Sequence, residues 1–163
     1  MGTTQQELFN RLEALAIETK TQQHEAAFTV DEARQLRGEI PGGHCKNLFL
    51  KDKKGKLWLI VCLEETQVNL KTAPAKIGSA RLSFGKPDLL METLGIAPGS
   101  VTPFALINDD KTTVTVILEQ RMMAHELLNY HPLQNEATTT IASDDLIKFI
   151  RSCGHDPQIV DLD

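Results

Sequence analysis

A run of small, cationic and polar residues precedes the strongest apolar segment of the chain. It begins with Gly42 and Gly43 and continues with His44, Lys46 and Asn47. Polar groups at the mouth of a strand are held on a rigid element, which is where a reactive site needs them. A lysine can bind a phosphate as a point charge. We therefore take His44, Lys46 and Asn47 as the first candidates for a site.

Two other segments carry candidate residues. Gly99 and Ser100 open a loop that ends at Pro103, and such a loop can direct backbone N–H groups at an anion or an oxyanion. His131 precedes a proline, which holds it in an extended conformation. Alone, each is explained as well by a turn, a solvated lysine or an ordinary histidine. Only together do these residues indicate a site.

Zinc binding is one alternative. The pairs His44-Cys45 and Cys153-x-His155 contain the right ligand types but lack the usual ligand spacing. Neighbouring residues on a strand also point to opposite faces. There is no serine nucleophile elbow, phosphate-binding loop or dinucleotide-binding motif. The sequence disfavours zinc without excluding it.

Thiol catalysis is another alternative. Cys45 would need a base such as His44, His125 or His131, and the sequence does not show whether any of them lies beside it. Cys62 lies inside an apolar strand, where a core position is expected. Thiol catalysis by Cys45 therefore remains open, ranked below a site built on Lys46.

Composition places the chain among ordinary globular proteins. It has 163 residues, 41% of them apolar and 24% charged, which suits one domain with its own core. No apolar run reaches the roughly 20 residues that span a membrane, and the N-terminus lacks a signal-peptide pattern. Three widely spaced cysteines form no disulfide framework and suit a reducing compartment. We expect a cytoplasmic location.

Charge is unevenly distributed. The chain carries a net −5, but residues 46–86 hold nine basic and three acidic side chains, a net +6, against −11 for the remainder. A basic segment on an acidic protein suits a short contact with phosphates. Lysines that guard exposed strand edges are the alternative explanation.

Periodicity and capping residues predict a mixture of helices and strands. We expect helices at 4–18, 31–36, 89–94 and 144–153. We expect strands at 48–50, 57–63, 80–84, 104–107 and 113–118, an extended segment or loop at 21–30, and a helical turn and a strand within 119–130. Asp88 and Ser143 are the expected N-caps, with Gly95 and Gly154 as stops. Tight turns between neighbouring strands favour a mixed or largely antiparallel sheet with packed helices.

The segment from Arg37 to Asp52 closely resembles the prolyl-tRNA editing domain family. That family includes the insertion domain of bacterial prolyl-tRNA synthetases and the freestanding YbaK/ProX-type deacylases. The Gly99-to-Pro103 loop and the segment Asn129–Leu133 match it in the same order and spacing. The resemblance spans nearly the whole chain, and the motif that begins at Lys46 is its specific part. The branch that removes alanine from mischarged proline tRNA is the most similar.

The resemblance implies a fold and a reaction. The implied fold is a single compact α+β domain over residues 1–163, with a curved, mixed, largely antiparallel sheet and surrounding helices. The implied reaction is hydrolysis of Ala-tRNA(Pro) by water, with no metal, cofactor or covalent enzyme intermediate. The implied partners are the tRNA(Pro) acceptor end and prolyl-tRNA synthetase, without DNA or membrane. Alternatives are another small aminoacyl ester such as Cys-tRNA(Pro), or a non-catalytic module that binds tRNA or synthetase.

The resemblance also assigns catalytic roles. Lys46 matches the family's essential lysine, near the terminal adenosine and its phosphate. Asn47 and His131 would orient the amino acid and the sugar. Gly99 would offer a backbone N–H to the developing oxyanion.

Further residues are expected to complete the substrate site. His44, Ser100 and Pro103 are expected to contact the substrate. Phe28 is the expected wall of a pocket for a small side chain, together with Leu15 and Ile17.

Overall fold

The most apolar run of the sequence forms a central strand, β3 (Leu57–Leu63). The computed structural model describes residues 4–23, 42–134 and 136–162. Strand β2 (Gly43–Asp52) pairs antiparallel with β3 through a tight turn in which Gly55 has a φ of 85°. Glycine adopts a positive φ without the steric cost that a Cβ brings. The geometry of this turn therefore explains why the sequence has a glycine between the two strands.

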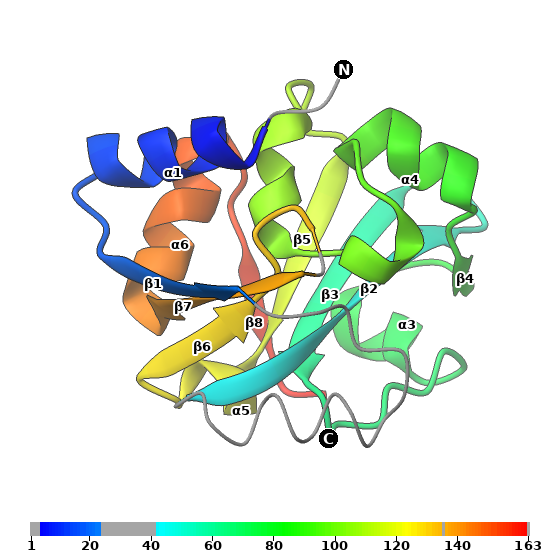
Figure 1. The fold of residues 1–163 in the computed structure, drawn as a ribbon. Coiled ribbons are helices and arrows are strands. Elements are labelled where there is room, and N and C mark those ends of the chain that lie inside the picture. Colours follow the sequence, from blue (N-terminus) through cyan, green and yellow to red (C-terminus); the bar gives the residue numbers. More distant parts are fainter. Residues whose placement is uncertain (1–3, 24–41, 135, 163) are drawn as a thin grey trace.

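Six more strands complete the sheet (Figure 1). They are β1 (Thr19–Gln23), β4 (Leu82–Phe84), β5 (Val114–Glu119), β6 (Leu127–Tyr130), β7 (Ala137–Ala142) and β8 (Gln158–Val160). The order is β1-β7-β6-β2-β3-β5-β8, with β4 paired to β2. The pairs β2–β6, β3–β5 and β5–β8 are parallel and the other described pairs antiparallel. The expected mixed sheet is therefore present.

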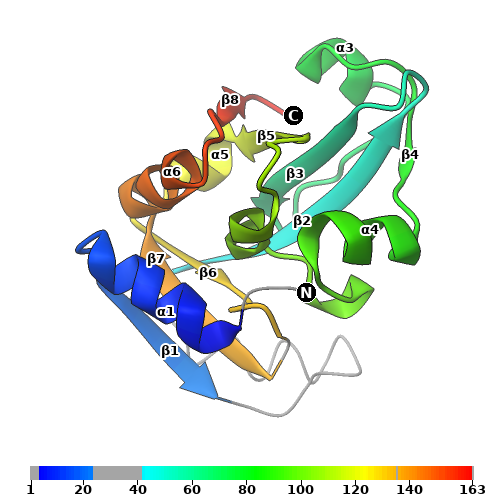
Figure 2. The same cartoon turned by 90° about the horizontal axis from the view of Figure 1, so that it is seen from above.

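Helices cover both faces of the sheet (Figures 1 and 2). They are α1 (Gln5–Ala14), α3 (Ala73–Ile77), α4 (Pro87–Leu94), α5 (Gln120–Met123) and α6 (Ser143–Ser152), with the 3-10 helices η1 (Pro98–Ser100) and η2 (Pro103–Asn108). The larger core packs α1, α4, η2 and α6 on one face, and a smaller core packs α3 on the other. The result is the α+β domain that the sequence predicts.

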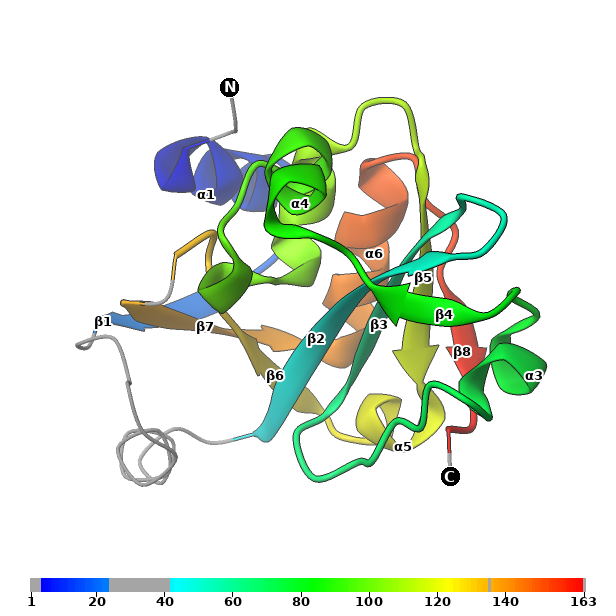
Figure 3. The same ribbon diagram turned by 90° about the vertical axis from the view of Figure 1, so that its right-hand side faces the viewer.

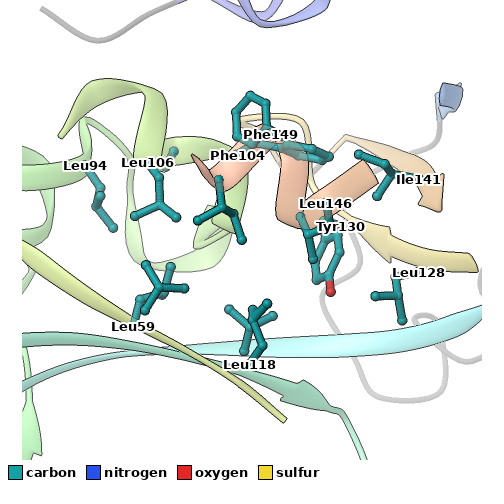
Figure 4. Packing of buried hydrophobic residues seen from close by; sticks show 14 of the residues in the cluster. Leu59, Leu94, Phe104, Leu106, Leu118, Leu128, Tyr130, Ile141, Leu146 and Phe149 are labelled. Atoms are coloured by element: carbon teal, nitrogen blue, oxygen red, sulfur yellow. The ribbon is translucent and has the colours of Figure 1, made fainter. Parts of the chain in front are cut away.

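Aromatic residues from three separate elements form the middle of the larger core (Figure 4). The ring of Phe104 lies edge-on to Phe149 at 5.4 Å and to Tyr130 at 6.0 Å between ring centroids. Edge-to-face pairs add about 0.5–1.5 kcal/mol beyond the area that they bury. These contacts join η2, α6 and the end of β6.

Several local expectations are wrong. Residues 104–107 form part of η2 rather than a strand, because Pro103 occupies the first turn and the Thr102 hydroxyl caps it by accepting from the Phe104 N–H. Asp88 lies inside the first turn of α4, and Lys86 occupies its N-cap. Ser143 begins α6, and Ala142 occupies that N-cap.

Other differences concern elements that were missed or cannot be compared. The strands β7 and β8 and the helix α3 have no counterpart among the sequence expectations. The expected helix at 31–36 lies outside the described residues. Across the described part of the chain, no helix combines the length and apolar character needed to cross a membrane.

Candidate functional site

On the edge of β2 that faces away from β3, neighbouring strands pair with the two ends of β2 but not with its middle, among the described residues. Along the edge away from β3, strand β6 pairs only with Gly43 and His44, and strand β4 pairs only with Leu50–Asp52. Among the described residues, no strand pairs with 45–49 on this edge. We call residues 45–49 the open edge of β2, and Lys46 and Asn47 lie in it.

Backbone groups of the open edge face outward from the sheet. The His44 carbonyl accepts from the Glu64 N–H at 3.0 Å, on the β3 side, whereas the Phe49 carbonyl accepts from the Gly85 N–H at 2.9 Å, on the opposite side. Alternate residues of a strand direct their backbone groups the same way. The backbone N–H and carbonyl of Asn47 therefore point into the open edge.

The side chains of Lys46 and Asn47 leave β2 toward opposite faces. Lys46 lies opposite Cys62, which belongs to the core under α3, and Asn47 lies opposite Val61, which belongs to the larger core. Burial raises the pKa of Cys62 to about 12, and the nearby Lys46 charge acts in the opposite direction. A ligand that both side chains contact must therefore lie along the strand edge.

Asn47 carries a buried polar atom with an unused hydrogen-bonding capacity. Its Oδ1 is buried and has no hydrogen-bond partner among the described residues. An unsatisfied buried acceptor costs about 1–3 kcal/mol, so such atoms call for an explanation. An amide oxygen accepts from ammonium, hydroxyl and N–H donors. Asn47 is thus suited to hold a donor group of a ligand.

The second candidate segment reaches the site through β6. His44 lies opposite Asn129 in the parallel β2–β6 pair, and the Asn129 side chain donates to the Gly43 carbonyl at 3.1 Å. His131 follows β6, half-buried, with Nδ1 3.2 Å from the Ala137 carbonyl. Because a carbonyl only accepts, Nδ1 carries the proton in this contact. The structure thus brings His44 and the segment before His131 together.

The third candidate segment forms two short helices. Gly99 is exposed and Ser100 half-buried in η1, whereas Pro103 is buried at the start of η2. In Figures 1 and 3 the turn of η1 and the loop after β6 lie near each other, beside β2. The three segments therefore gather on one side of the molecule. Buried Pro103 packs against the protein rather than presenting a surface to a ligand.

The expected pocket wall is described only in part. Phe28 lies outside the described residues. Ile17 is 5% exposed in the larger core, and Leu15 packs against the same core. The role of these residues in selecting a small side chain remains a prediction.

Cys45 is poorly suited to act as a nucleophile. Burial raises the pKa of its thiol to about 12, although hydrogen bonding to Tyr130 and Asn129 lowers it somewhat. Because the thiolate is the reactive form, Cys45 is unreactive near neutral pH. Within residues 4–23, 42–134 and 136–162, no three histidine, cysteine or acidic side chains gather closely enough to hold a metal ion.

The basic segment of the sequence forms a groove at the far end of β2. The groove has a volume of about 760 Å³ and lies between β4, α4 and the β2–β3 turn. Its lining contains four basic residues and three acidic ones: Lys51, Lys53, Arg81 and Lys86, and Asp52, Asp88 and Glu92. The groove also contains Phe84, which the sequence analysis did not single out. The available signal was an aromatic residue in a short strand that Arg81 and Lys86 flank.

Comparisons with known proteins identify the family and the fold. The profile of the aminoacyl-tRNA editing domain matches residues 24–149. A Bos taurus protein, "prolyl-tRNA synthetase associated domain-containing protein 1", is 38% identical over 96% of this chain and 94% of its own. The "prolyl-tRNA editing protein ProX" of Acetoanaerobium sticklandii is 31% identical over 96% of both chains.

A solved structure described as that of a candidate trans-editing enzyme for prolyl tRNA synthetase has the same fold. Its TM-score is 0.72 over 99% of this chain and 98% of the other, at 19% identity. The likeness extends across the whole sheet and its helices.

Proposed function

Because this chain belongs to the aminoacyl-tRNA editing domain family, we propose that it hydrolyses mischarged tRNA(Pro), with Ala-tRNA(Pro) as its main substrate. The main support is that Lys46 and Asn47 lie next to each other at the open edge of β2. Lys46 carries a cation, and Asn47 has a buried acceptor oxygen without a partner among the described residues. Relatives named for prolyl-tRNA editing support proline tRNA as the carrier.

The open edge suits an aminoacyl ester. The Lys46 ammonium would hold the phosphate of the terminal adenosine. The Asn47 carboxamide oxygen would accept from the α-ammonium of the amino acid, which would satisfy that atom. His131, oriented by the Ala137 carbonyl, would position the sugar. These contacts would leave the ester carbonyl beside β2 and η1.

Water would complete the reaction. Its oxygen attacks the ester carbon, aided by the free ribose hydroxyl, and the bond from that carbon to the ribose oxygen breaks. The products are the free amino acid and a tRNA with both hydroxyls. The Gly99 N–H would stabilise the oxyanion, and one such donor is worth about 3 kcal/mol of barrier. An ester is already activated, so positioning and charge stabilisation suffice.

A separate editing site is needed because a synthetase discriminates weakly against a smaller substrate. A missing methylene changes selectivity by only about 1–3 kcal/mol. A second site that admits alanine and excludes proline restores accuracy by size. The basic groove would bind the phosphates of the acceptor strand outside this site.

The proposal is tested by deacylation of a matched substrate panel. Purified protein is incubated with alanyl-, cysteinyl- and prolyl-tRNA(Pro), and ester loss is followed over time. We expect rapid loss of the alanyl ester and persistence of the prolyl ester. Persistence of all three esters at high protein concentration, with tRNA binding retained, would favour the non-catalytic module instead. Faster loss of the cysteinyl ester would reassign the substrate.

A further inference from the structure

The groove at the far end of β2 has walls that are held rigidly. The buried Asp52 carboxylate accepts from the Trp58 indole at 3.1 Å and from the Ala80 N–H at 3.3 Å. The Lys53 N–H donates to the Arg81 carbonyl at 2.9 Å. These bonds join the β2–β3 turn to the segment before β4. The cations at 53 and 81 therefore lie on backbone whose geometry is set before any ligand binds.

Phe84 is the most exposed large apolar side chain of the described residues, at 64%. Leu82, two residues earlier on the same face of β4, is only 6% exposed. The backbone after Phe84 is fixed, because the Gly85 N–H bonds to the Phe49 carbonyl and a Cβ at Gly85 would lie 2.4 Å from the Phe49 ring. Phe84 thus presents its ring within the groove from a rigid support.

The cations beside Phe84 are available to a ligand. Among the described residues, Lys51, Lys53, Arg81 and Lys86 form no ion pair within 4 Å. An exposed aromatic ring among unpaired cations is the combination that binds single-stranded nucleic acid, because bases stack on the ring and phosphates contact the cations. The lining also holds the exposed carboxylates of Asp88 and Glu92, so the four cations exceed the exposed acidic groups by two. That excess favours phosphates over an apolar protein segment.

The Phe84 ring and the Lys46 side chain lie on the same face of the sheet, at a spacing that can be derived from the strand register. Phe84 lies opposite Leu50, and residues 46, 48 and 50 share one face of β2. Lys46 and Phe84 therefore lie on the same face, separated by four residues of strand or about 14 Å. Stacked nucleotides rise about 3.4 Å each along one strand, so this spacing equals about four nucleotides.

We propose that Phe84 is a stacking platform for a nucleobase of the acceptor strand, about four nucleotides from the aminoacyl ester. The inference rests on the proposed function, since it takes RNA as the ligand that also reaches Lys46. The groove cations hold the phosphates on either side of the stacked base. Phe84 contributes to RNA affinity and does not touch the ester.

Binding of deacylated tRNA(Pro) tests the platform without requiring turnover. Dissociation constants are measured at fixed ionic strength for wild type and for Phe84→Leu, Phe84→Tyr and Ile159→Ala. Leucine keeps an apolar side chain without an aromatic face, and tyrosine keeps the face. Ile159 is 52% exposed on β8 and controls for loss of exposed apolar surface. We expect about tenfold weaker binding for Phe84→Leu, and wild-type affinity for the tyrosine variant and the control.

Kinetics separate this inference from the proposed function. If Ala-tRNA(Pro) is hydrolysed, Phe84→Leu should raise KM about tenfold and leave kcat unchanged. Equal affinities for the leucine and tyrosine variants would overturn the platform while leaving the deacylase intact. If no ester is hydrolysed but Phe84→Leu alone binds tRNA more weakly, the deacylase proposal is rejected and the stacking proposal stands. Loss of synthetase binding with unchanged tRNA affinity in Phe84→Leu would also overturn it.

Discussion

Asn47 and Asp52 lie five residues apart on β2, and both bury side-chain oxygens, but among the described residues only Asp52 has hydrogen-bond partners for its buried oxygens. Asp52 accepts from the backbone N–H groups of Lys54 and Lys56 at 3.0 and 2.9 Å, besides its bonds to Trp58 and Ala80. Asn47 Oδ1 has no partner in the described part of the chain. The two residues share a strand and differ in what surrounds them.

The difference suggests a division of roles along β2, with Asp52 serving the fold and the open edge serving a ligand. Where β4 pairs with β2, a buried carboxylate organises a turn and the walls of a groove. At the open edge, a buried amide oxygen costs stability unless a ligand supplies a donor. We therefore expect changes at Asp52 to act on folding and changes at the open edge to act on turnover. The following experiments test that division.

Lys46→Ala should give the largest effect. If Lys46 holds the acceptor phosphate as proposed, its loss should lower kcat/KM for Ala-tRNA(Pro) about 10²–10³-fold, because the ester is no longer positioned. Steady-state deacylation measures this, with the exposed Lys111→Ala as a matched control. Wild-type turnover in Lys46→Ala would remove the lysine from the site.

Asp52→Asn should destabilise the fold. An amide cannot accept at both ends, so either the Trp58 and Ala80 donors or the turn N–H groups would lose their acceptor. The free energy of unfolding should fall by about 2–4 kcal/mol in urea denaturation. Asp88→Asn, at an exposed position of the same groove, should change it little. An unaltered unfolding midpoint for Asp52→Asn would contradict a structural role.

Asn47→Ala should show the opposite pattern. Deacylation should slow about 10–100-fold, while the free energy of unfolding should stay unchanged or rise by up to about 1 kcal/mol, because no described hydrogen bond is lost from Oδ1. Asn129→Ala is the matched comparison, since its side chain does bond to the Gly43 carbonyl. If Asn47→Ala proved the less stable of the two, Asn47 would have a structural role like that of Asp52.

Low pH should reduce the contribution of Asp52 to the free energy of unfolding. Burial alone would raise the pKa of Asp52, but hydrogen bonds from Trp58 and nearby backbone N–H groups lower it below its ordinary value. The stabilisation is therefore present above the unfolded-state pKa of about 4 and is lost as pH falls through the lower folded-state pKa. The stability gap between wild type and Asp52→Asn should narrow from about pH 7 to about pH 3 in urea denaturation. A constant gap would argue against an ionised Asp52.

Cys45→Ala should have the smallest effect on catalysis. The half-buried thiol has a pKa raised to about 12 and stays protonated, so turnover per folded molecule should remain within about twofold of wild type. Rates are normalised to the folded fraction from circular dichroism. Abolished turnover would revive the thiol mechanism.

Prediction from sequence worked where local pattern and packing agree. Seven consecutive apolar residues form β3 as expected, and the spacing of Leu8 and Leu12 marks the buried face of α1. The strand β7 was missed because Thr139 occupies a fully buried position. Its hydroxyl lies 2.7 Å from that of Thr21, which belongs to a strand 118 residues away. A polar residue satisfied by so distant a partner hides the alternation that marks a strand.

The sequence yielded a set of candidate site residues but not their positions in the fold. Lys46, Asn47, Gly99 and His131 were all named from sequence, and the order of their motifs indicated the family. Phe84 was missed because its exposure depends on where β4 pairs with β2, which is a tertiary contact. Pro103 was expected to contact substrate, yet packing buries it.

By itself, the sequence determined the family, the strand that carries Lys46 and Asn47, and the divergence of these two side chains, since neighbouring residues of a strand point to opposite faces. Only the tertiary structure decided that, among the described residues, no further strand pairs with the middle of β2, because β4 and β6 come from later in the chain and stop short of each other. Local pattern fixes the direction of a side chain, whereas long-range pairing decides what it faces.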